Sequence, residues 1–240
     1  MFNLISRTVD YPLHSLLGFD IHKVSLEPFA LLHPSLTLLS ELYTTGEPIL
    51  SISKGLKKKG VTNDAQNIED IAHDVENLLY RNNYHVQVNP IRVHAINQEL
   101  NKKISSNNLN VLNSRHVFLE NPISSIPVDI YEFIFAVQLK NLVPVINFPE
   151  KDTHFTSKSQ RLLRLEDRGC VFHIDLLSLS GHNGQEAKKV ACALLQNKQV
   201  QFVSFQIKAL EEIKKNKGIR ISRKIANLLD EQLFVSLPQF

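Results

Sequence analysis

Tryptophan is absent from this sequence of 240 residues, which has only two cysteines, one methionine and eight glycines. The cysteines, Cys170 and Cys192, have neither the spacing of a redox pair nor that of a zinc-binding knuckle. Because both lie among apolar residues, we expect them to be reduced residues of the core. The shortage of glycine and the lack of tryptophan argue against a glycine-rich repeat and a carbohydrate-binding surface.

Long apolar segments are also missing. No apolar run reaches the roughly 18 to 20 residues that a membrane-spanning helix needs. The first residues, MFNLISRTVDYPLH, lack the continuous apolar core of a secretion signal. We therefore expect a cytoplasmic protein without a membrane partner. The formal net charge of +3 is too small to indicate a polyanionic partner by itself.

Length and composition predict a single α/β domain over residues 1–240. The chain is long enough to bury a substantial core without metals or disulfides, and 43% of its residues are hydrophobic. Residues 1–47 are expected to be an irregular N-terminal segment, because Pro12, Pro28 and Pro34 interrupt their apolar pattern. Residues 209–240 are expected to form a helical C-terminal extension.

Apolar runs alternate with helical patterns along most of the chain. Strands are predicted over residues 48–53, 85–89, 115–120, 142–148, 170–177 and 200–207. Helices are predicted over residues 91–104, 128–142, 156–168 and 184–196. This order favours alternating βα units and a mainly parallel sheet, either barrel-like or doubly wound. The last strand alternates enough to suit an edge position.

The stretch VPVINFPEKDTHFTSKSQRLLRLEDRGC, residues 143–170, resembles the phage beta-protein family in the spacing of its strand, helix and strand. The resemblance implies a barrel-like fold. It assigns no role to any residue, and no activity follows from it.

Five polar residues come at or just after the ends of predicted strands. They are Lys54, Asn89, Glu120, Asn147 and Asp175. Because the carboxyl ends of parallel strands meet at one edge of a sheet, we expect a ligand site there.

The turn SKGLKKKGVT lies between a predicted strand and a predicted helix and has part of a phosphate-binding pattern. Gly55 and Gly60 have the spacing of a phosphate-binding loop, but Val61 stands where that loop has its lysine. An anion could still bind to the cationic side chains of Lys54, Lys57, Lys58 and Lys59. The alternative is a solvated basic turn.

His173 and Asp175 fall on the same face of a predicted strand, with His154 and His182 nearby in the sequence. Imidazole and carboxylate groups there could bind a divalent metal or divide acid and base roles, with Glu120 as a third candidate for acid–base work. The spacing matches no metal-binding motif, so we assign neither a metal nor a cofactor. The alternative is a core histidine beside an aspartate that caps the next loop.

The leading hypothesis is a strand-end pocket for an anionic, phosphate-bearing ligand, in which Asn147 and the lysines bind the ligand. In a hydrolase, His173, Asp175 and Glu120 would be the catalytic groups. A second hypothesis is a non-catalytic interaction or assembly protein, for instance in phage–host conflict, with the apolar tail 233–240 binding a partner. A third is a sequence-nonspecific nucleic-acid binder that uses the basic residues between 208 and 224.

Overall fold

The computed structural model describes residues 8–11, 19–22, 49–53, 87–112, 115–121, 130–155, 160–206 and 219–236, with single positions between 70 and 81. The lysine-rich turn at 54–59, the end of the apolar tail and most of the basic segment at 208–224 lie outside these ranges. What the sequence predicts for those segments therefore stays a prediction.

A parallel β-sheet organises the fold. Its strands are β2 (Phe19–His22), β3 (Ile49–Ser53), β4 (Gln87–Ile91), β5 (Val93–Ala95), β6 (His116–Glu120), β7 (Val143–Asn147), β8 (Val171–Asp175) and β9 (Val200–Gln206). They form an eight-stranded sheet in the order β4-β3-β2-β9-β8-β7-β6-β5, and each paired neighbour is parallel. The predicted α/β fold with a mainly parallel sheet is confirmed.

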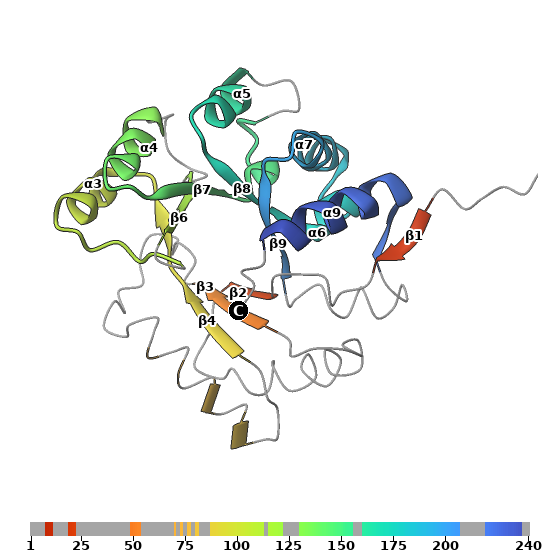
Figure 1. The fold of residues 1–240 in the computed structure, drawn as a ribbon, viewed down its shortest axis with the longest axis horizontal. Coiled ribbons are helices and arrows are strands. Elements are labelled where there is room, and N and C mark those ends of the chain that lie inside the picture. Colours follow the sequence, from red (N-terminus) through yellow and green to blue (C-terminus); the bar gives the residue numbers. More distant parts are fainter. Residues whose placement is uncertain are drawn as a thin grey trace, which may run out of the picture.

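The two ends of this sheet are joined by the chain itself. Strands β4 and β5 stand at opposite ends of the strand order, yet only Arg92 separates them in the sequence. The sheet must therefore curl round until its ends meet. Figure 1 shows this curvature, with β6 to β9 above and β2 to β4 below. Of the two arrangements that the sequence left open, the structure has the barrel-like one.

Helices lie outside the curled sheet. They are α3 (Gln98–Ser105), α4 (Ile130–Gln138), α5 (Gln160–Asp167), α6 (Leu176–Ser180), α7 (Gln185–Gln196) and α9 (Arg223–Ser236). A 3-10 turn, η2 (Pro149–Lys151), follows β7, and β1 (Thr8–Tyr11) pairs antiparallel with β10 (Ile219–Ser222). Figure 1 shows α3, α4, α5, α7 and α9 in an arc around β6 to β9.

The core has two parts: an outer core between the sheet and the helices, and an inner apolar cluster on the interior face of the sheet. Because side chains alternate along a strand, Val117 and Leu119 of β6 face the helices, whereas Phe118 faces the interior. Cys170 is free and lies in the outer core, and burial raises the pKa of its thiol to about 12. It is a reduced core residue, as predicted.

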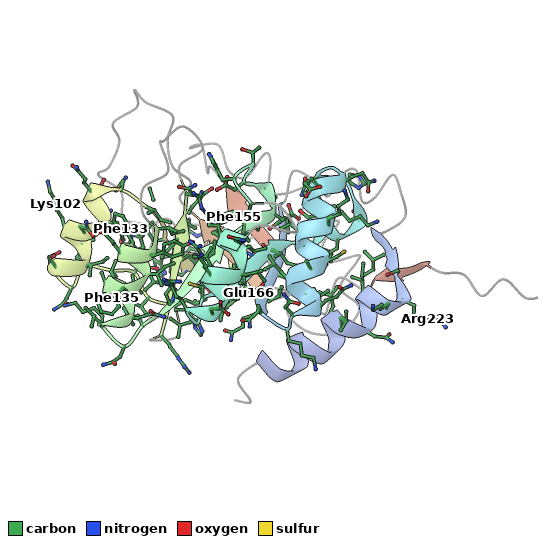
Figure 2. The ribbon with its side chains drawn as sticks, turned by 90° about the horizontal axis from the view of Figure 1, so that it is seen from above. Lys102, Phe133, Phe135, Phe155, Glu166 and Arg223 are labelled. Carbon is green, nitrogen blue, oxygen red and sulfur yellow. The ribbon has the colours of Figure 1, made fainter. Side chains whose placement is uncertain are left out.

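Figure 2 shows the outer side of the helical layer. On α4, Phe133 is buried in the core, whereas Phe135 is 62% exposed. Lys102 of α3 and Arg223 of α9 lie near opposite ends of the described part of the molecule. None of the helices in the described ranges is long and apolar enough to cross a bilayer.

Several predicted elements need correction. The last strand, β9, is not at an edge but lies between β2 and β8. The segment 91–104 is not one helix: it begins with the end of β4 and with β5, and α3 starts only after Asn97, whose side chain accepts the Glu99 and Leu100 amide hydrogen bonds.

The two ends of the chain also differ from expectation. The segment 1–47, predicted to be irregular with possible short strands near residues 19–24, contributes β1 and β2, and β2 belongs to the main sheet. The predicted helical extension 209–240 contains the strand β10 before α9. Leu229 of α9 is fully buried in the outer core, so α9 packs on the domain and is no appendage.

Replacing Leu194 by alanine tests the outer core. Leu194 of α7 is 0% exposed, so the substitution leaves a cavity and should lower the free energy of unfolding by about 2–5 kcal/mol. The matched control is Leu163→Ala on α5, where the side chain is 52% exposed and the cost should stay below about 1 kcal/mol. Urea denaturation followed by circular dichroism measures both, and equal losses would contradict this packing.

Candidate functional site

Side chains that face the interior change from apolar to polar toward the carboxyl ends of the strands. The apolar layer contains Phe118, Val145 and Val171, with Phe202 packed against it. Two residues further along each strand, on the same face, come Glu120, Asn147, His173 and Ser204. We call these four residues the polar layer. The predicted convergence of polar residues at the strand ends is therefore present on β6 to β9.

Three members of the polar layer form a hydrogen-bonded chain across neighbouring strands. The Nδ1 atom of His173 lies 2.7 Å from Oδ1 of Asn147, and its Nε2 atom lies 2.7 Å from Oγ of Ser204. The amide oxygen can only accept, so Nδ1 carries the proton and donates it to Asn147. In the neutral ring Nε2 then accepts the hydroxyl proton of Ser204. Both ring nitrogens of His173 are therefore occupied.

A register shift between β8 and β9 makes this chain possible. Phe172 pairs with Val200, but the next residue, His173, pairs with Phe202, so β9 has one extra residue at Gln201. Such a bulge changes which side chains of a strand face inward. Here it brings Phe202 and Ser204 to the interior face, where Ser204 reaches His173.

Aromatic rings enclose His173. The ring centroids of Phe148, Phe118 and Phe202 lie 4.4, 5.6 and 6.4 Å from that of His173. Phe148 has φ 47° and ψ 50°, a left-handed conformation that is strained for an aromatic residue. The backbone amide of Phe148 donates to the carbonyl of His173 at 2.8 Å, which fixes this turn directly after β7.

A second network surrounds Asp175 at the end of β8. The Oδ1 atom accepts the Leu177 amide at 2.9 Å and thereby caps α6. The Oδ2 atom lies 2.5 Å from Nζ of Lys151 and accepts a bond from Nδ2 of Asn183 at 3.2 Å. Lys151 also lies 4.3 Å above the ring of Phe148. Asp175 is thus a helix cap and an ion-pair partner.

Glu150 supports this second network from beneath. Its Oε1 atom accepts the Asp175 amide at 2.9 Å and the Ser178 hydroxyl at 3.0 Å. The side chain is buried, and its Oε2 atom has no hydrogen-bond partner in the described part of the chain. Burial raises the pKa of Glu150 to about 7. A neutral carboxylic acid is therefore its ordinary form below neutrality.

A third group of charges lies after β6 and β7. Burial raises the pKa of Glu120, and Asp152 raises it further, whereas Lys151 opposes the shift. Asp152 contacts Nδ1 of His154 at 2.7 Å and accepts a hydrogen bond from Asn121 at 3.0 Å. The described rim thus has more carboxylates than cations.

The structure brings together part of the predicted site. Asn147 and His173 are in direct contact, and Asp175 lies on the same strand as His173 but belongs to the second network. His154 contacts Asp152, and His182 contacts Ser180; neither contact joins the hydrogen-bonded chain of His173. The side chains of Lys54, Lys57, Lys58 and Lys59 lie outside the described residues.

Three important residues were missed by the sequence analysis: Ser204, Glu150 and Lys151. Ser204 occupies a strand position that could be located from the predicted strand 200–207, but the extra residue at Gln201 hides which way it faces. Glu150 and Lys151 follow the predicted strand 142–148 directly, so their position after a strand end was the available signal.

The comparison with protein families decides the identity of the fold. Residues 35–234 match the family described as capsular polysaccharide synthesis, CpsB/CapC. This chain belongs to the CpsB/CapC family. The match is to a different family from the phage beta-protein family that residues 143–170 resemble, and it does not support that resemblance.

Among characterised relatives, a tyrosine-protein phosphatase of Bacillus subtilis (strain 168), YwqE, is 23% identical over 143 residues. The match covers 59% of this chain and 56% of the relative, so it spans little more than half of that protein. A solved structure from work on YwqE and on CpsB from Streptococcus pneumoniae, described as unique metal-dependent tyrosine phosphatases, superposes with a TM-score of 0.65. It is 18% identical, with 95% of this chain and 93% of that chain covered. This similarity shows a shared fold.

Whether this family member could hold a metal depends on its donor atoms. Among the described residues, no group of three or more His, Cys, Asp or Glu side chains is arranged to bind one. His173 has both nitrogens in hydrogen bonds, and both oxygens of Asp175 are used. The described part of the rim therefore does not fit a metal ion.

Glu150→Gln tests the buried carboxylic acid. Because folding raises the pKa of Glu150 from 4.5 to about 7, its native form is favoured at low pH and loses stability as the pH rises through this window. The loss is on the order of 3 kcal/mol. Glutamine keeps the oxygen that accepts from Asp175 and Ser178, so the variant should lack this part of the pH dependence.

The measurement is the free energy of unfolding between pH 4.5 and 8, compared between the variant and the wild type. Burial lowers the pKa of His94 to about 4, which makes wild type and variant alike less stable at low pH. The difference between the two proteins removes this contribution. A difference that does not change with pH would show that Glu150 titrates normally.

Proposed function

We propose that this chain binds a phosphorylated ligand at the carboxyl ends of its strands, and that the ligand is a phosphorylated tyrosine side chain. The match of residues 35–234 to the CpsB/CapC family supports this most directly, because a relative in the comparison is a tyrosine-protein phosphatase. The shared fold with metal-dependent tyrosine phosphatases is consistent with it. In barrels of parallel strands, ligands bind at the carboxyl ends.

The lysine-rich turn is the proposed source of attraction for the phosphate. Ser53, the last residue of β3, pairs with His22 of β2 and Ile91 of β4, so Lys54 follows the carboxyl end of β3 directly. Parallel strands place that end on the same rim as Asn147 of β7. Lys57, Lys58 and Lys59 come a few residues later, and their ammonium groups would attract a phosphate.

The described half of the rim gives a reason to assign the attraction to this turn. Its one lysine near the polar layer, Lys151, is already paired with Asp175 and stacked over Phe148. Free positive charge must therefore come from elsewhere if a phosphate binds there. The turn that begins at Lys54 has four lysines within six residues.

Of the three residues expected to do acid–base work, Glu120 has the carboxylate that is least committed. Asp175 caps α6, and His173 is bonded to Asn147 and Ser204. Glu120 is half-buried, and its pKa is raised by burial. We therefore propose that Glu120 contacts the bound ligand and that Asn147 and His173, from the same polar layer, line the base of the ligand site.

Charge removal in the turn tests the proposal. The triple variant Lys57→Ala, Lys58→Ala, Lys59→Ala should bind O-phospho-L-tyrosine at least about ten-fold more weakly than the parent, a loss of about 1.4 kcal/mol. Isothermal titration calorimetry measures the affinity, with thermal stabilisation as a second readout. Tyrosine without phosphate should not bind.

A matched control removes three positive charges elsewhere. Lys102, Lys140 and Lys189 are exposed on or just after α3, α4 and α7, and Lys102 lies at one end of the described part in Figure 2. Their combined replacement by alanine should leave the affinity within about two-fold of the parent. Equal losses in both triple variants, or a parent that binds neither phosphotyrosine nor inorganic phosphate, would overturn the proposal.

A further inference from the structure

We infer that, at the described ends of β6 to β9, a hydrogen-bonded network takes the place of a metal centre, so that this chain holds a phosphorylated ligand without metal-dependent hydrolysis. This inference rests on the proposed function and makes it more specific. It also separates this chain from YwqE and CpsB, which are described as metal-dependent phosphatases.

Both ring nitrogens of His173 are engaged in hydrogen bonds. A histidine binds a metal through the lone pair of a ring nitrogen, and the other nitrogen is then held by a hydrogen bond. In this chain Nδ1 is held by Asn147 and Nε2 is held by Ser204, each at 2.7 Å. A metal ion would have to displace one of these partners inside a buried site, which would leave a polar group unsatisfied.

The carboxylates of Asp175 and Glu150 have other roles. Asp175 has both oxygens in use, one for the helix cap and one for Lys151, and Lys151 already supplies the positive charge that a metal would bring. Glu150 is buried, its Oε1 atom accepts the Asp175 amide and the Ser178 hydroxyl, and burial raises its pKa to about 7, which disfavours the ionised form that a metal ligand needs. Both groups are therefore disfavoured as charged donors to a metal ion.

Aromatic rings also limit access to His173. The ring of Phe148 lies 4.4 Å from that of His173, Phe118 of the apolar layer lies 5.6 Å from it, and His173 is buried. Phe148 holds its place in spite of a left-handed backbone, which costs on the order of 1–3 kcal/mol. The surrounding structure therefore enforces this arrangement, and the ring closes the approach to His173.

The same three residues have the order of a nucleophile, a base and an orienting group. Ser204, His173 and Asn147 could in principle form such a relay. However, Ser204 and His173 are each 4% exposed, so a phosphoryl group cannot reach Oγ as the site stands. The hydrogen-bonded residues Asn147, His173 and Ser204 therefore support the rim from inside the barrel.

The decisive experiment measures metal in the full-length chain. The protein is purified from cells grown with added manganese, iron and zinc, and its metal content is determined by mass spectrometry, with YwqE prepared in parallel. We expect a substoichiometric content, no thermal stabilisation by MnCl2 or ZnCl2, and an affinity for O-phospho-L-tyrosine that EDTA changes by no more than about two-fold. Stoichiometric metal or EDTA-sensitive binding would overturn the inference.

Hydrolysis of p-nitrophenyl phosphate supplies a second readout. We expect no turnover above that of the buffer with or without added manganese. Turnover that requires the metal would contradict the inference, and so would metal-free turnover that is lost in Ser204→Ala. Because metal content is measured without any ligand, the inference can fail while phosphate binding holds, and binding can fail while the metal result stands.

Nuclear magnetic resonance of the histidine rings examines the network itself. With 15N-labelled protein, His173 should show the neutral form protonated at Nδ1, and its signals should not broaden when paramagnetic Mn2+ is added. The signals are assigned with His173→Gln. Selective broadening of the His173 signals at low Mn2+ concentration would place the ion at this site and refute the inference.

Discussion

The interior of a parallel barrel has to satisfy every polar side chain that its strands turn inward, and this constraint organises the strand ends. Asn147, His173 and Ser204 come from three adjacent strands and are joined by two hydrogen bonds, through Oδ1 of Asn147, both ring nitrogens of His173 and Oγ of Ser204. Because each bond joins two strands, the network also fixes the strands relative to one another. This layer is connected to its surroundings. The turn after β7 bonds to the backbone of His173, and Asp175 of the second network lies on the same strand as His173.

Two networks meet at the end of β8 and have different electrostatics. The interior hydrogen-bonded chain joins an amide, an imidazole and a hydroxyl group, whereas the network around Asp175 combines a carboxylate, an ammonium group and a buried acid. Lys151 joins them, since it pairs with Asp175 while it stacks on the Phe148 ring that covers His173. The rim is therefore a connected unit in which a change at one carboxylate alters the aromatic cover.

The sequence predicted the parts of the fold that local patterns determine. The strands β7 and β8 and the helix α7 follow from apolar periodicity, and the strand-end rule located Glu120 and Asn147 in the layer where they lie. The position of β9 could not be predicted in the same way, because its pairing with β2 joins segments far apart in the sequence, and the bulge with β8 that turns Ser204 inward leaves no local pattern. Asp175 is a cap, as the alternative interpretation of the sequence had it, but it caps the helix α6 rather than a loop. The burial of Glu150 depends on contacts made by η2, α6 and β8 together.

Closure through a single residue has a consequence for tolerance to change in this barrel. On either side of Arg92 the chain passes from one end of the strand order to the other, and Val93 faces the inner apolar cluster while His94 bonds to the Asn110 amide outside it. A one-residue insertion there would exchange the faces of these two side chains. An imidazole would then enter the apolar layer and a valine would leave it. At the junction of β4 and β5, an insertion or deletion would therefore disrupt barrel closure more than a side-chain substitution would.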